Sequence, residues 1–201
     1  MRLALRFVVP AATVAAAFAL FGAEKDAHAQ YYVVRREPAS VGLNLGLDAE
    51  GAADVTPPQN ASTIGGGGFK IRIGAEIRRP FLRFIPEGGF SYDHLFYSDN
   101  NGNSQGWNME RAFVGGRIGF GQVIVPIVYA HVGYGWRVTS GDGGALQSAN
   151  ASGLTADGGV GLDFHLIRNV GFGVHLEYVT VQTSVAVPDW VAFGGHMDVR
   201  F

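Results

Sequence analysis

The sequence predicts an all-β fold in which eight antiparallel strands close into an up-and-down transmembrane β-barrel, preceded by an N-terminal signal peptide. Three observations lead to this prediction. The N-terminus carries a short apolar run behind two arginines, as a secretory signal does. Eight later segments alternate between apolar and polar residues with a period of two, which is the pattern of β-strands. The connections between these segments are alternately long and short, as in transmembrane barrels.

The composition of the 201-residue chain excludes several classes of protein. With 47% hydrophobic and 16% charged residues, the chain is neither disordered nor collagen-like. Its net charge of -2 offers no basic surface for a phosphate backbone, so no nucleic-acid partner is expected. Cysteine is absent, which excludes disulfides, thiolate metal ligands and thiol catalysis.

Residues 1–29 are predicted to be a cleaved signal peptide. Arg2 and Arg6 precede an apolar run over residues 7–22, and Ala27-His28-Ala29 supplies the small-x-small pattern of a cleavage site. The apolar run is too short for a helix that spans the hydrocarbon core of about 30 Å. The mature chain is therefore expected to work outside the cytoplasm.

Strands are expected to carry the mature chain across the membrane, because no later stretch is long and apolar enough for a spanning helix. A periplasmic linker is predicted over residues 30–38 and the barrel over 39–201. The alternating segments run over residues 41–48, 69–78, 82–96, 111–120, 128–137, 154–166, 170–178 and 191–201. The apolar face takes the odd-numbered positions in the first, second and last segments and the even-numbered positions in the other five. Pro86 and Gly88-Gly89 predict a bulge or kink in the third segment.

The connections distinguish the two ends of the predicted barrel. The long ones cover residues 48–67, 98–109, 138–153 and 180–189, and the short ones 79–81, 121–126 and 167–169. Long loops outside and short turns in the periplasm are typical of transmembrane barrels. The outer rim is predicted to be acidic, with Asp48, Glu50, Asp54, Asp99, Glu110, Asp142 and Asp189. Basic residues gather at the opposite end: Arg35, Arg36, Arg79, Arg168 and Arg200.

Side-chain volume indicates which face of the strands points outward. The apolar faces carry Phe, Tyr, Trp and Ile, the polar faces are rich in Gly, and an eight-stranded barrel has a narrow lumen that side chains fill. We therefore expect the bulky apolar faces to contact lipid. Two aromatic belts would result, one of Tyr92, Phe96, Tyr134 and Trp136 and the other of Phe81, Phe84, Phe120 and Phe201. The alternative is a soluble periplasmic ligand-binding barrel, which has the same alternation.

The end of the chain and the two segments before it carry a resemblance to a known group. The chain closes on His196-Met197-Asp198-Val199-Arg200-Phe201, and the preceding strands contain 158–164 and 171–178. Over residues 39–201 this pattern resembles the small outer-membrane barrels of the OmpA and OmpX type. The resemblance implies the cell outer membrane as location, contact with its lipid and lipopolysaccharide, and recognition of Phe201 by the barrel-assembly machinery.

Charged residues on the inward faces predict an ion-pair network in the lumen. Its fifteen members are Lys70, Arg72, Glu76, Arg78, Arg83, Glu87, Asp93, Arg111, Arg117, Arg137, Asp157, Asp163, Glu177, Asp198 and Arg200. Eight are basic and seven acidic. Such a balance favours a plugged lumen, because a selective pore shows an excess of one sign. A narrow gated channel is the alternative.

Four inward histidines raise the possibility of a metal site. They are His131, His165, His175 and His196. Imidazole is a common ligand, but the spacing matches no known ligand signature, and lumen histidines bonded to carboxylates are commoner. Neither a metal nor another cofactor is predicted.

A last candidate lies on the outward face. His94, Ser98 and Glu110 share that face on neighbouring strands, and a Ser, His and carboxylate facing lipid would resemble the lipid A deacylase barrels. That family places its Ser two residues after its His, where this chain has Phe96. We assign no catalytic residue and expect a monomer with a structural or surface-interaction role, whose long loops contact an extracellular ligand.

Overall fold

The computed structural model describes residues 40–55, 61–99, 104–140, 151–167, 169–183 and 189–201. The predicted signal peptide and periplasmic linker lie outside these residues. None of the described residues belongs to a helix long and apolar enough to cross a membrane.

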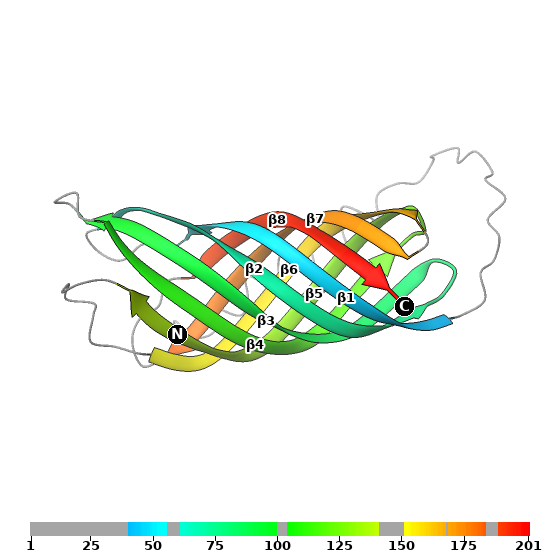
Figure 1. The fold of residues 1–201 in the computed structure, drawn as a ribbon, viewed down its shortest axis with the longest axis horizontal. Coiled ribbons are helices and arrows are strands. Elements are labelled where there is room, and N and C mark those ends of the chain that lie inside the picture. Colours follow the sequence, from blue (N-terminus) through cyan, green and yellow to red (C-terminus); the bar gives the residue numbers. More distant parts are fainter. Residues whose placement is uncertain (1–39, 56–60, 100–103, 141–150, 168, 184–188) are drawn as a thin grey trace, which may run out of the picture.

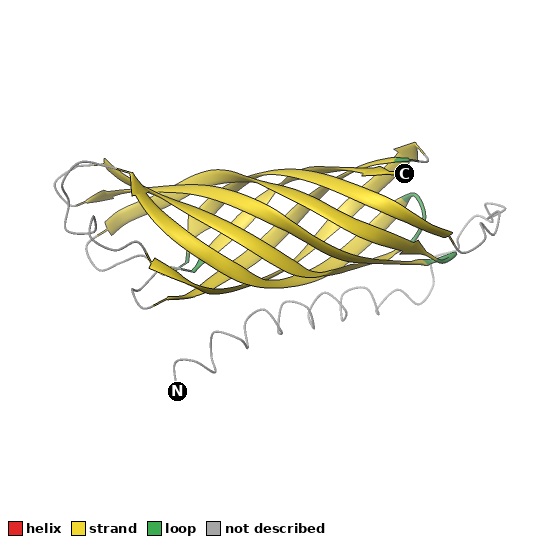
Figure 2. Cartoon of the chain, turned by 60° about the horizontal axis from the view of Figure 1, so that its bottom comes forward, coloured by secondary structure: helices red, strands yellow, loops and turns green. Residues whose placement is uncertain are grey.

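Eight antiparallel strands form one closed barrel in which each strand pairs with its neighbours in chain order (Figures 1 and 2). The strands are β1 Ser40–Asp54, β2 Ala61–Arg78, β3 Leu82–Asp99, β4 Ser104–Phe120, β5 Ile124–Ser140, β6 Ala151–Ile167, β7 Val170–Thr183 and β8 Trp190–Arg200. The predicted fold class is confirmed.

Pairing between the first and last strands closes the barrel. The register of β1 and β8 runs from Asn44 opposite Arg200 to Asp54 opposite Trp190, and Figure 1 shows the end of β8 beside β1. Beyond the end of β8, Phe201 exchanges two backbone hydrogen bonds with Leu43, of 2.9 and 3.1 Å. Closure leaves no sheet edge, so the backbone satisfies its own hydrogen-bonding groups, as lipid requires.

The strands are longer than the sequence predicted at the end with the long connections. The observed connections there are residues 55–60, 100–103, 141–150 and 184–189, which we call the long-loop end. Residues 79–81, 121–123 and 168–169 connect the strands at the other, short-turn end, where Gly121 has φ of 121°. The predicted loop boundaries at the long-loop end were wrong because backbone pairing continues through residues that lack apolar alternation.

Residues 65–68 and Pro126 show why composition misplaced these boundaries. The predicted connection over residues 48–67 included the first three of these four glycines, yet each of the four pairs with a residue of β1 and of β3. The fifth strand was expected to follow Pro126, but β5 begins at Ile124 and Pro126 pairs with Leu162 of β6. Strand pairing depends on neighbouring backbone groups, which the composition of a single segment does not reveal.

The two faces of the wall differ as predicted, with apolar side chains outside and charged side chains inside. Val41, Ile71, Val114, Val132 and Leu154 are among the exposed apolar residues. Buried polar residues occupy the alternate positions along the same strands, as the burial pattern of β1 shows. An outer wall of exposed apolar side chains is the surface that a barrel presents to lipid.

Apolar side chains also fill part of the interior. At the long-loop end a cluster, here called the apolar cap, contains Ala52, Leu95, Trp107, Met109, Val179, Val181, Trp190 and Ala192. A smaller group of Val125, Ile127 and Tyr129 lies at the start of β5, towards the short-turn end. Several charged residues of the lumen, among them Lys70, Arg72 and Arg111, lie between these two groups along the barrel.

Candidate functional site

Of the fifteen residues predicted to form the lumen network, thirteen are buried. Arg78 and Arg200 are half-buried, and both lie at the last position of their strands at the short-turn end. Arg137 is buried near the apolar cap, with its guanidinium 5.2 Å from the ring centre of Trp107. The remaining charged residues fall into three contacting groups and one histidine-rich group.

The first group surrounds Lys70 and Arg111. Lys70 donates to Glu177 at 2.5 Å, although 107 residues separate them in the chain. Arg111 contacts Asp157 at 3.1 Å, Asp93 at 3.4 Å and Glu177 at 3.5 Å. Two cations and three carboxylates therefore form one buried group, with Glu177 in contact with both cations. An unpaired charge would be costly there.

The second group is centred on Arg72 and Arg117. Arg72 contacts Glu87 and Asp198, each at 3.2 Å. Arg117 contacts the same two carboxylates, at 3.4 and 3.3 Å. Arg72 has a third acidic neighbour, Asp48, at 2.6 Å.

The third group lies at the short-turn end around Glu76. Arg78 donates to Glu76 at 2.7 Å, and Arg200 and Arg83 approach the same carboxylate at 3.8 and 4.0 Å. Arg83 also donates to the backbone carbonyl of Gln122 in the adjoining turn at 2.8 Å. This group therefore links β2, β3 and β8 to the short turn between β4 and β5.

Three acidic residues predicted to lie on the outer rim are instead buried. Asp48 and Glu50 point into the lumen because β1 continues to Asp54 and keeps its even-numbered positions inward. Asp189, at the long-loop end, accepts a hydrogen bond of 2.9 Å from the Tyr178 hydroxyl. Among the described side chains, ten buried carboxylates thus accompany six buried Lys and Arg. Extending the alternation of the first strand beyond residue 48 would have identified Asp48 and Glu50 as inward-facing residues.

The histidines divide between two places in the lumen. His131 contacts Asp157 through Nδ1 at 2.6 Å and Glu87 through Nε2 at 3.0 Å. His175 and His196 face each other, with 3.3 Å between their Nδ1 atoms. The structure thus brings together two of the histidines weighed for a metal site and places His131 between a carboxylate of the first group and one of the second.

Carboxylates also flank the His175 and His196 pair. His175 Nε2 lies 3.1 Å from Glu50, and His196 Nε2 lies 2.7 Å from Asp163. His165 approaches the other oxygen of Asp163 at 3.8 Å. These contacts link β1, β6, β7 and β8 on the inside of the wall.

Comparison with known proteins rests on structure. No protein-family profile and no curated protein sequence matches the chain. Among solved structures, neisserial surface protein A has a TM-score of 0.52 at 16% identity, over 82% of this chain and 100% of that one. Ail, the attachment invasion locus protein of Yersinia pestis, solved with the heparin analogue sucrose octasulfate, has a TM-score of 0.52 at 14% identity over the same shares.

This chain has the fold of a small outer-membrane β-barrel. The resemblance to the OmpA and OmpX type is confirmed at the level of fold, and at these identities the likeness extends no further. The predicted outer-membrane location agrees with this fold and with the apolar outer wall.

The residues considered as a candidate esterase triad are His94, Ser98 and Glu110, on the strands β3 and β4. His94 contacts the side-chain oxygen of Asn108, its register partner on β4, at 2.6 Å. Glu110 accepts a hydrogen bond of 2.5 Å from the Trp136 indole of β5. Ser98 pairs with Ser104 in the backbone register, and its side chain lies outside the described ones. His94 and Glu110 therefore each have a partner outside the hypothetical triad.

Proposed function

We propose that this outer-membrane barrel has a structural or surface-contact role and that its lumen is plugged. The apolar cap is the observation that carries the proposal. In the cap, Trp107 packs edge-to-face against Trp190 with ring centres 6.1 Å apart, and Leu95 and Met109 are almost fully buried. A constriction lined by apolar side chains resists wetting, so it opposes the passage of hydrated ions.

The ion pairs beneath the cap support the same proposal. The groups around Lys70 and Arg72 join strands that are far apart in the sequence, as in the contact between Lys70 of β2 and Glu177 of β7. Buried charges that satisfy one another leave few groups to solvate a passing ion. The fifteen predicted residues, together with Asp48 and Glu50, thus act as a structural filling of the lumen.

Planar-bilayer recording tests the plug. The purified barrel is expected to give no steady conductance, whereas a porin recorded in the same bilayer does. Replacing two cap residues with serine, Leu95→Ser and Met109→Ser together, is expected to increase conductance because it removes the apolar constriction. A steady conductance from the unaltered barrel, unchanged by the double substitution, would support the narrow-channel alternative.

Contact with an extracellular ligand is the part of the role assigned to the long-loop end. The chain has no Lys or Arg over residues 48–68, 98–110, 138–167 or 178–199, and Asp54, Asp99 and Asp142 lie in or beside the connections of the long-loop end. This charge pattern favours divalent cations or cationic surfaces and disfavours sulfated polymers. Binding of a cationic partner should fall on deletion of residues 51–64 and 140–152, and binding that survives both deletions would refute this role.

The other partners of the proposed role are the lipid and lipopolysaccharide of the outer membrane and the machinery that inserts barrels into it. A monomer needs no partner subunit, because the strands close on themselves. Catalysis is not part of the proposal. An unchanged lipid A acylation pattern after His94→Ala supports that view, and a change would revive the esterase.

A further inference from the structure

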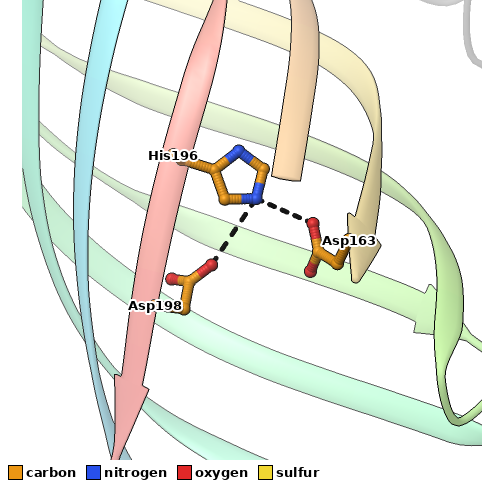
Figure 3. A group of neighbouring side chains, drawn as sticks. All are labelled: Asp163, His196 and Asp198. Carbon is orange, nitrogen blue, oxygen red and sulfur yellow. Dashed lines mark hydrogen bonds and ion pairs between the residues drawn. The ribbon is translucent and has the colours of Figure 1, made fainter. Parts of the chain in front are cut away.

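Asp163 of β6 and His196 and Asp198 of β8 converge in the lumen, as Figure 3 shows. His196 Nε2 lies 2.7 Å from Asp163 Oδ1 and 3.6 Å from Asp198 Oδ2. All three residues are buried, and one ligand atom from each lies within 4.8 Å of the others. Two ligands about 2.1 Å from one metal ion at the tetrahedral angle are about 3.4 Å apart. The Asp198 spacing is close to this value, and the Asp163 oxygen would move about 0.7 Å away from His196 to admit an ion.

Hydrogen bonding by the neighbouring histidine indicates what His196 offers to this group. His175 Nε2 faces the Glu50 carboxylate at 3.1 Å, and a carboxylate accepts, so His175 donates from Nε2. In a neutral ring its Nδ1 is then an acceptor, and His196 must donate to it across the 3.3 Å contact from its own Nδ1. A neutral His196 protonated at Nδ1 carries its lone pair at Nε2.

That lone pair points at two carboxylate oxygens. Three electron-rich atoms, His196 Nε2, Asp163 Oδ1 and Asp198 Oδ2, would repel one another unless a positive charge lies among them. Either one further proton on the pair of His175 and His196 or a bound cation meets this need. The chain from Glu50 through His175 to His196 has the form that commonly orients a ligating histidine, in which a carboxylate fixes the ring through its other nitrogen.

The side chains around the group contribute charge, hydrogen bonds and space. Ten buried carboxylates accompany six buried Lys and Arg among the described side chains, and the half-buried Arg78 and Arg200 add two more cations, so carboxylates outnumber cations by two. Arg72 forms an ion pair with Asp198 at 3.2 Å, and Arg117 donates a hydrogen bond of 3.3 Å to its other oxygen. Ligating carboxylates are commonly held by hydrogen bonds of this kind. Gly173 leaves room at the group, because a Cβ at that position would collide with His196 and Asp163.

The group lies beside a small cavity on the side of the short-turn end. Asp163 and Asp198 line this cavity together with His165, Asn44 and Arg83. Asp198 lies two positions before the end of β8, and the His165 side chain is 13% exposed. The apolar cap is at the opposite end, so the periplasmic side provides the shorter approach.

We propose that Asp163, His196 and Asp198 bind a divalent transition-metal ion, with Zn²⁺ as the best match to one imidazole and two carboxylates. His175 and Glu50 position His196, and the ion ties β6 to β8 near the periplasmic mouth. Imidazole favours Zn²⁺ over Mg²⁺ and Ca²⁺, which prefer sites made of oxygen alone. The site is independent of the proposed surface role.

Metal binding by the folded barrel tests this proposal. Folded protein, identified by its faster migration without boiling, is stripped with a chelator and titrated with Zn²⁺ at micromolar concentration by calorimetry, with Mg²⁺ as comparison. One Zn²⁺ per barrel and little heat from Mg²⁺ are expected. The absence of stoichiometric Zn²⁺ binding would overturn the proposal.

Variants then locate the ion. Asp163→Asn and His196→Gln should each lower the Zn²⁺ affinity at least tenfold, and His175→Gln, which positions a ligand, about 10- to 100-fold. His94→Gln is the matched control, since His94 lies on the outward face, and it should bind as the unaltered barrel does. If a ligand variant fails to fold, the visible spectrum of Co²⁺ bound to the unaltered barrel reports the ligands directly. Equal affinity in all folded variants, or a Co²⁺ spectrum that lacks nitrogen coordination, would refute the site.

Discussion

Arg72 donates to both carboxylate oxygens of Asp48 across the β1 and β2 pair, from Nε at 3.0 Å to one and from Nη2 at 2.6 Å to the other. Gly46 permits this arrangement, since a Cβ on it would overlap the guanidinium. The pair is buried, and Arg72 also reaches Glu87 and Asp198. One arginine thus connects carboxylates from β1, β3 and β8, which makes it a central residue of the lumen.

Arg72→Met should therefore lower the free energy of unfolding strongly, by about 3 to 5 kcal/mol, because three buried carboxylates would lose a partner. Asp48→Asn should cost less, since Arg72 keeps Glu87 and Asp198. Urea titration in detergent micelles, with the folded fraction taken from unboiled gels, measures both. Equal losses for the two variants would contradict this account of the group.

Trp190 in the apolar cap is expected to be a second centre of stability. Its side chain is fully buried, its ring packs against Trp107, and the Arg111 guanidinium lies 5.4 Å from the ring centre. Trp190→Ala should destabilise the barrel by about 3 to 5 kcal/mol, the usual cost of emptying a large aromatic site. The control is Phe193→Ala on the outward face of the same strand, where the loss should be smaller. In the same urea titration, a larger loss of stability for Phe193→Ala than for Trp190→Ala would contradict a packed apolar cap.

Contact of the outward face with lipid can be tested by placing a charged residue at two depths, one at the middle of β5 and one in the turn before it. Val132 is at the middle of β5 and 62% exposed, and Val123 is in the preceding turn and 57% exposed. Val132→Arg should cost about 2 to 4 kcal/mol in a lipid bilayer, and Val123→Arg about 0 to 1, because the penalty depends on depth. Unfolding in phospholipid vesicles measures the difference. Similar small costs at both positions would favour the soluble barrel.

Phe201 provides a test of assembly that is separate from stability. Its contacts with Leu43 are backbone hydrogen bonds, which Phe201→Ala retains, and its side chain is exposed. We predict that Phe201→Ala lowers the amount of folded barrel in cellular outer membranes severalfold and changes refolding into detergent little. Phe201→Tyr, which keeps the ring, is the control. A normal cellular yield from Phe201→Ala would remove the assembly role.

Sequence reasoning reached the fold because the alternation of a membrane strand is imposed by lipid on one side and a narrow lumen on the other. In β2 both faces follow this pattern, and the prediction of Lys70, Arg72 and Glu76 as inward residues needed nothing else. It failed where that pattern ends. Asp48 and Glu50 were placed on a rim because the residues around them are small and polar, while the strand itself continues to Asp54.

The sequence did not show which lumen side chains contact one another, for a different reason. Lys70 and Glu177 lie 107 residues apart, and Asp163 and His196 lie 33 apart. Their contacts depend on the tilt and register of strands that are not neighbours, and these are fixed only when β1 pairs with β8.

The sequence by itself determined which side chains face lipid and which face the lumen, since a period of two leaves each position only one side. The tertiary structure decided which inward charges meet. Closure sets the stagger between strands, and that stagger places the Nδ1 atoms of His175 and His196 3.3 Å apart while it places His131 between Glu87 and Asp157.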